Sequence, residues 1–398
     1  MSESAATRQG LRGKRPDRDA MTGVNAGRHR RRRGGERPMV PPAEFTSYYG
    51  KPILNSPVWE SPDIPGYLFL GGLAGGSSLL AAGADLTGRP VLARVAKTGA
   101  IAGGAVSVLA LIHDLGRPAR FLNMMRVFKV TSPMSVGSWL LAGYVPAAGA
   151  AALSALTGRL PKVGVAATAG SALLGPAVAS YTAALISNTA VPAWHDGYPE
   201  MPFVFTGSGA MAAGGLGLLA ALPGNAGPGE TAPARNLAVL GAAMELAAAQ
   251  RMEQRIGMVA EPYSQGRGGK YVKAGKALAV LGVAGALLGW RSRAVAALSG
   301  VTLITASAAT RWGIYHAGMA SAGDPKYTVV PQRQRLTERA AADGHAPAGS
   351  SDDGRVLRAG RRRAAASRSL RRRIAGMRIP AAGRARRPGA GCRGADAG

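Results

Sequence analysis

Residues 66–84 read GYLFLGGLAGGSSLLAAGA, an uncharged run of 19 apolar or small residues. A helix needs about 20 predominantly apolar residues to cross the hydrocarbon layer of a bilayer. Because glycine and alanine outnumber bulky side chains here, the run suits a helix that approaches its neighbours closely in lipid. It therefore predicts a transmembrane helix rather than a helix of a water-soluble core.

Seven further segments of comparable length follow this run. Most are separated by short links with turn residues, such as 87–90 and 157–159, which predict antiparallel neighbours. We therefore expect an all-α integral membrane protein, an up-and-down bundle of about eight transmembrane helices in the cell (plasma) membrane. The expected spans are residues 66–84, 91–112, 134–156, 163–187, 203–222, 234–251, 274–290 and 294–317, of which 234–251 is the least apolar.

Residues that bind redox centres are scarce in this chain. Cys392 is the only cysteine, which excludes a disulfide framework and any zinc or iron–sulfur site built from this chain's own thiolates. A haem b within a helical bundle usually needs two facing histidines at membrane depth. Only His113 and His316 lie near predicted spans, each at a helix end, so we expect neither an intrinsic haem nor a metal site.

Two strongly basic segments flank the apolar part of the chain. Residues 1–40 carry 11 Lys/Arg against 4 acids, and residues 337–398 carry 15 against 5. Both lack apolar periodicity, so we expect them to be disordered. Their arginine runs raise the hypothesis of nucleic-acid binding, but no nucleic-acid-binding fold accompanies them. Contact with anionic membrane lipid is the favoured interpretation, and no nucleic-acid partner is expected.

Two ionisable residues fall inside predicted spans. Glu245 lies mid-way along the sixth span and Arg311 lies within the eighth. Charges at membrane depth are costly and are therefore functional candidates. Two interpretations stay open at this stage, a buried ion pair between them and a path for protons.

A second group of polar residues closes the second span. His113, Asp114 and Arg117 place an imidazole, a carboxylate and a guanidinium at one membrane surface. A quinone head group needs hydrogen-bond donors and a proton route, and histidine beside a carboxylate can supply both. The alternative is a helix-end anchor with Arg117 on lipid phosphates. Tyr181, in the fourth span, is either a donor to a quinone or a partner in an interhelical hydrogen bond. Tyr67 fits an aromatic belt at the interface.

Four segments of the chain resemble the NrfD/polysulfide reductase membrane-subunit family. They are HDLGRPARFLNM at 113–124, SPMSVGSW at 132–139, YTAALISNTAVPAW at 181–194 and ASAGDPKYTVVPQRQRL at 320–336. The resemblance covers about residues 44–336. It therefore implies a membrane domain over 44–336 between two basic tails, 1–43 and 337–398.

The resemblance implies a specific role. Members of this family are haem-free membrane anchors that join an iron–sulfur electron-transfer subunit, often with a molybdopterin catalytic subunit, and exchange electrons with quinone. We accordingly expect menaquinone or ubiquinone to bind here, with iron–sulfur clusters and molybdopterin on partner subunits. Whether the chain is itself quinone-reactive or a non-catalytic anchor stays open.

The resemblance strengthens the case for His113, Asp114, Arg117 and Tyr181 as quinone-binding residues, and we add Tyr67 to this candidate quinone site. One stretch departs from the family pattern, because residues 61–67 read SPDIPGY, without the asparagine and histidine expected at the start of the first span. A secondary transporter is the alternative function, with Glu245 and Arg311 lining a solute path. The internal repeat that many transporters show is not evident between 66–187 and 203–317.

Overall fold

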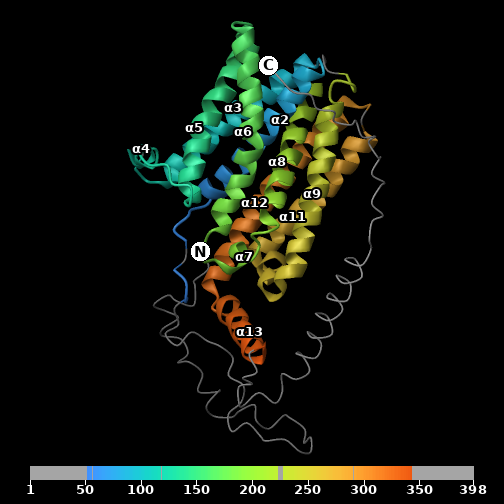
Figure 1. The fold of residues 1–398 in the computed structure, drawn as a ribbon. Helices are drawn as coiled ribbons and strands as arrows, with labels where there is room; N and C mark the ends of the chain where they lie inside the picture. The colour runs from blue at the N-terminus through green and yellow to red at the C-terminus, as the bar shows by residue number, and fades with distance from the viewer. Residues whose placement is uncertain (1–51, 56, 118, 223–226, 290, 343–398) are drawn as a thin grey trace, which may run out of the picture. The chain divides into compact units, whose positions relative to one another are not determined.

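The computed structural model describes residues 52–55, 57–117, 119–222, 227–289 and 291–342 (Figure 1), and every regular element among them is helical. The predicted tails, residues 1–43 and 337–398, lie outside this part of the chain except for residues 337–342, which complete the last helix.

Long helices dominate the described part of the chain, and short ones occupy the connections. The long helices are α2 (Asp63–Leu86), α3 (Pro90–Asp114), α5 (Pro133–Thr157), α6 (Pro161–Ser187), α8 (Met201–Leu218), α9 (Ala232–Ile256), α11 (Gly266–Leu288) and α12 (Arg293–Gly323). The connecting elements are α4 (Ala119–Met124), α7 (Pro192–His195), η1 (Leu219–Ala221), η2 (Gly257–Ala260) and α10 (Glu261–Ser264), and α13 (Lys326–Ala342) follows α12.

The expected membrane bundle is confirmed, but the number of spans needs a correction. Within the described residues, seven helices are long and apolar enough to cross a membrane, rather than about eight. The predicted span at 234–251 forms α9, which packs along α8 but does not meet this criterion. The reason is charge, since α9 carries Arg235, Glu245, Arg251, Glu253 and Arg255. Its continuous uncharged stretches are therefore shorter than a bilayer requires.

Helices α2 and α8 form the centre of the bundle. About 67% of the apolar part of α2 and 72% of that of α8 is buried within the protein, against 28–44% for the other five candidate spans. Each of the two contacts α3, α6, α9 and α12, and they contact each other. The remaining apolar helices thus leave most of their surface for lipid.

Glycines allow the central helices to touch through their backbones. A Cβ atom at Gly75 of α2 would overlap with the carbonyl oxygen of Gly175 on α6. A Cβ atom at Gly76 would lie 2.7 Å from the carbonyl oxygen of Gly209 on α8. The Gly-rich run at 71–76 therefore has a packing role, because only glycine permits an approach this close.

An ion pair between a buried carboxylate and a partly exposed guanidinium holds the connection before α8 against the end of α9. Glu200 is only 5% exposed, and its Oε2 lies 2.6 Å from Nη2 of Arg255. Arg255 also donates to the backbone oxygen of Asp196, so one guanidinium binds both ends of the segment 196–200. The hydrogen bond from Arg255 holds the pKa of Glu200 below its ordinary value.

We expect Glu200→Gln to lower the melting temperature of the purified protein by several degrees at neutral pH. A carboxyl group whose pKa is depressed by folding contributes stability above its ordinary pKa and loses that contribution as the pH falls through the depressed value. The difference between wild type and Glu200→Gln should therefore shrink on acidification. Thermal unfolding in detergent across this pH range measures it.

The control for this prediction is Asp85→Asn, which breaks the pair of Lys97 with a more exposed carboxylate, since the Asp85 side chain is 35% exposed against 6% for that of Glu200. Exposed ion pairs contribute little, so its effect should be small at every pH. A pH-independent effect of Glu200→Gln would contradict the assignment.

Candidate functional site

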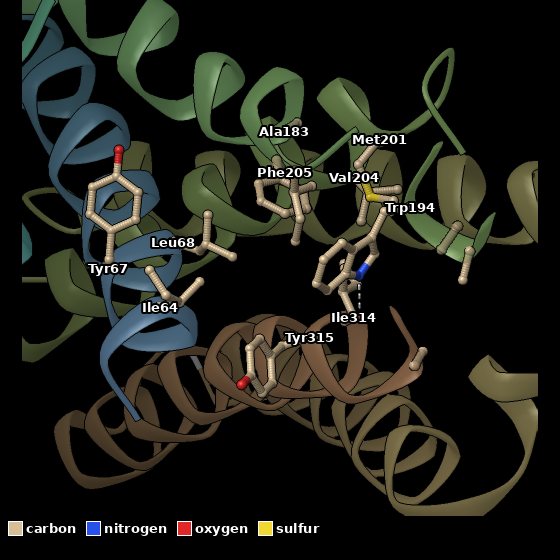
Figure 2. Close-up of a cluster of buried hydrophobic side chains, with 14 of the residues drawn as sticks. Ile64, Tyr67, Leu68, Ala183, Trp194, Met201, Val204, Phe205, Ile314 and Tyr315 are labelled. Atoms are coloured by element: carbon tan, nitrogen blue, oxygen red, sulfur yellow. Dashed lines mark hydrogen bonds between the residues drawn. The ribbon is translucent and has the colours of Figure 1, made fainter. Parts of the chain in front are cut away.

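Two tyrosines from different helices meet near one end of the bundle. The hydroxyl groups of Tyr67 on α2 and Tyr181 on α6 form a hydrogen bond. Tyr67 is fully buried, whereas Tyr181 is partly exposed. The hydroxyl of Tyr67 points away from Trp194 and Tyr315 (Figure 2). The structure thus joins two of the predicted site residues, which are 114 positions apart.

Gly137 explains how Tyr181 fits between the helices. A Cβ atom at this position of α5 would overlap with the ring of Tyr181. Gly137 belongs to the SPMSVGSW segment, so this segment contributes the surface against which the phenol lies. In the same segment Ser132 caps α5 by accepting a hydrogen bond from the Ser135 amide at 3.4 Å.

His113 lies at the end of α3 and pairs with the start of α2. Its Nδ1 is 2.6 Å from Oδ2 of Asp63, and its side chain is 81% exposed. Asp63 precedes Tyr67 by one helical turn, so the imidazole is linked to the helix that carries the buried phenol. Asp114 instead accepts a long, 3.4 Å hydrogen bond from the amide of Glu60.

Asp63 is a site residue that the sequence alone did not predict. The stretch 61–67 drew notice only for lacking an asparagine and a histidine, yet it supplies the carboxylate that binds His113. Its position four residues before Tyr67 was the available signal. Arg117 does not join this group, since it is exposed beyond α3 and, among the described residues, makes no hydrogen bond or ion pair with Asp63 or Asp114.

An aromatic cluster fixes the chain just before α2. Trp59 stacks on Trp194 of α7 with ring centroids 5.5 Å apart, and Tyr315 of α12 donates to the backbone oxygen of Trp59 at 2.7 Å. Trp194 in turn donates through Nε1 to the Ile314 carbonyl at 2.8 Å, the bond drawn in Figure 2. These contacts position the start of α2, and with it Asp63.

Glu245 and Arg311 lie in the interior but do not form a direct ion pair. Thr310 donates to Oε1 of Glu245 at 2.6 Å, and Nη2 of Arg311 donates to the Phe205 carbonyl at 2.7 Å. Glu245 is 3% exposed and Arg311 is fully buried, with its guanidinium 3.8 Å from the centroid of the Phe205 ring. No contact within 4.0 Å joins the two charges in the described structure, and the hydrogen bonds that each side chain makes go to other groups.

A small cavity adjoins Glu245. Its volume of about 20 Å³ is enough for one water molecule, and its lining extends along α9 from Glu245 to Glu253 and includes Lys276 of α11. Glu253 and Lys276 form an ion pair at 2.7 Å. Oε2 of Glu245 has no hydrogen-bond partner from the described residues. A role in proton movement stays a prediction.

Most of the residues described above lie in a part of the chain that matches a known protein family. The family model described as "Polysulphide reductase, NrfD" matches residues 53–249. The chain belongs to the NrfD family. The match runs from just before Trp59 into α9 and includes Tyr67, His113, Gly137 and Tyr181. The similar segment at 320–336 lies beyond the match. A search of curated proteins found no match.

Membership of the NrfD family has two direct consequences. The chain is a multi-pass membrane protein, and it is the membrane subunit of an oxidoreductase complex. NrfD proteins associate with catalytic and iron–sulfur subunits of such complexes. The tyrosine pair and the Asp63–His113 pair therefore belong to the membrane part of a redox assembly.

We expect Gly137→Ala to displace Tyr181 and to destabilise the NrfD bundle, because the added methyl group overlaps with the phenol ring. Gly143→Ala on the same helix is the matched control, since its Cβ would meet only Leu174 at an ordinary 3.5 Å. Melting temperature in detergent measures the difference. Equal stability of the two variants would contradict the tight contact at Gly137.

We expect Arg311→Leu to destabilise the protein by about 2–4 kcal/mol, because it removes the buried cation near Glu245 and a hydrogen bond to the Phe205 carbonyl. Arg293→Leu, at the exposed start of the same helix, should cost little. Unfolding of both variants in detergent tests this. Equal and negligible effects would mean that the bundle does not depend on the charge of Arg311.

Proposed function

We propose that this NrfD subunit is quinone-reactive and exchanges electrons between an iron–sulfur partner subunit and the membrane quinone pool. The observation that carries the proposal is the hydrogen-bonded pair Tyr67–Tyr181, one helical turn from the Asp63–His113 pair. Together they put phenol and imidazole donors at one end of an apolar bundle, where a lipid-soluble quinone can approach.

The tyrosine pair has the donor capacity that a quinone carbonyl requires. Two hydroxyl groups carry two protons, and their mutual hydrogen bond uses only one of them. The other proton remains available to a second acceptor. Tyr181 is the better placed of the two, since it is partly exposed while Tyr67 is fully buried.

The Asp63–His113 pair suits proton exchange with the aqueous side. Reduction of a quinone to a quinol takes up two electrons and two protons, and oxidation releases them. The imidazole of His113 is largely exposed, yet it contacts a carboxylate on α2. Histidine exchanges protons near neutral pH, so this pair can pass a proton between water and the start of α2.

The proposal assigns the other cofactors to partner chains. The chain's only cysteine is Cys392, which lies outside the described residues, so iron–sulfur clusters would sit on an electron-transfer subunit. A molybdopterin catalytic subunit would carry the substrate chemistry. Menaquinone or ubiquinone is the proposed membrane substrate, without a haem in this chain, and Glu245 and Arg311 are proposed to assist proton movement.

The test is quinol turnover by the purified complex with site variants. Tyr181→Phe and His113→Ala should each lower turnover roughly tenfold, the value of one hydrogen bond. Both should leave assembly with the iron–sulfur partner intact. Turnover with a soluble quinol analogue and co-purification of the partner are the two measurements.

Tyr144→Phe is the control, because Tyr144 is a buried tyrosine whose hydroxyl also makes an interhelical hydrogen bond, but to Ser78 outside the site, at 2.7 Å. It should keep normal turnover. Unchanged kinetics in both site variants would remove Tyr181 and His113 from the quinone site. A complex without any quinol activity would overturn the proposed function itself.

A further inference from the structure

The segment that joins α3 to α5 makes little use of the protein interior. Residues 119–131, which include α4, contain no buried residue. In Figure 1 α4 and its flanking loops project sideways from the bundle instead of covering the helix ends. The side chains of this segment are therefore free to contact lipid or another protein.

Its side chains are strongly apolar for a surface segment. Leu122 is 69% exposed, Val127 67%, Phe128 59% and Val130 75%. Large apolar side chains clustered on a surface mark a contact with another apolar phase. These exposed side chains therefore indicate that the segment contacts an apolar partner outside this chain.

Its charges are of one sign. Arg120, Arg126 and Lys129 are all exposed, and residues 119–131 contain no acid. Apolar side chains interleaved with basic ones are the composition of segments that lie at the boundary between headgroups and acyl chains. Long basic side chains can reach lipid phosphates while their stems stay in an apolar layer.

Its place in the chain brings the segment to a membrane surface. Helices α3 and α5 are both candidate spans, so the link between them leaves the bilayer and re-enters it. The link is also held in place. Ser135 Oγ donates to the Val127 carbonyl at 2.9 Å and accepts from the Lys129 amide at 3.0 Å. The ring of Phe128 meets Trp139 of α5 edge-on at 6.2 Å.

We propose that residues 119–131 lie in the headgroup layer beside the bundle and bind anionic phospholipid. Leu122, Val127, Phe128 and Val130 enter the acyl region, and the three basic side chains bind lipid phosphates. Lipid is favoured over a partner protein because the segment projects sideways, next to the lipid-facing surface of α5. This proposal does not depend on quinone chemistry.

The test places a spin label on the segment in the full-length chain. Val127→Cys in a Cys392→Ser background is labelled with a nitroxide and reconstituted into nanodiscs of phosphatidylcholine, with or without phosphatidylglycerol. The label should collide more often with oxygen than with a water-soluble nickel chelate, and phosphatidylglycerol should increase this preference. Thr87→Cys, in the polar turn between α2 and α3, should give the opposite preference.

Charge variants separate lipid binding from simple apolar contact. Replacing Arg120, Arg126 and Lys129 by glutamine should abolish the extra effect of phosphatidylglycerol, because each basic residue contributes to the attraction of an anionic surface. Replacing the exposed residues Arg94, Arg159 and Lys162 by glutamine is the matched control and should retain it.

Two outcomes would overturn the proposal. One is a Val127 label that the nickel chelate reaches freely in both kinds of nanodisc. The other is a label that becomes protected only when partner subunits bind, which would make the segment a protein-docking surface. Val130→Cys serves as a second labelling site if Val127→Cys does not fold.

Discussion

Close backbone contact at glycines is the constraint on which the bundle depends. Gly75 meets Gly175 of α6, and Gly76 meets Gly209 of α8, at distances that no side chain allows. Helices α2 and α6 run antiparallel, so this contact also determines which residues of the two helices face each other further along their length. Tyr67 lies eight residues before Gly75, about 12 Å along the helix, and there its hydroxyl reaches Tyr181. The packing of small residues thus creates the polar contact proposed to serve the quinone.

The polar groups of the interior fall into two separate sets. One set, at the ends of α2 and α3, joins the exposed His113 to Asp63 and leads to the tyrosine pair. The other set holds Glu245 of α9 and Arg311 of α12, through Thr310 and the Phe205 carbonyl. The second set is less completely satisfied, because Oε2 of Glu245 and Nε and Nη1 of Arg311 have no hydrogen-bond partner among the described residues. No hydrogen bond or ion pair among the described residues links the two sets directly.

Much of the fold could be predicted because apolar length is a local property. Seven spans followed from runs of apolar residues, and α9 failed as a span for the same local reason, its charges. The candidate site was predictable only in part. Tyr67, His113 and Tyr181 stood out by residue type, but Asp63 did not, since its partner His113 is 50 positions away. Arg117 was grouped with them by sequence proximity, yet it is exposed beyond the end of α3.

The amino-acid sequence by itself determined that this chain is a helical membrane protein without a thiolate-bound redox centre, and its motifs indicated the NrfD family. Those properties depend on composition and on neighbours within one helix. Only the tertiary structure decided the partners of the polar residues. Glu245 bonds to Thr310 rather than to Arg311, and Tyr181 fits against Gly137. The physical reason is that such contacts depend on the rotation and depth of packed helices, which no periodicity within a single helix encodes.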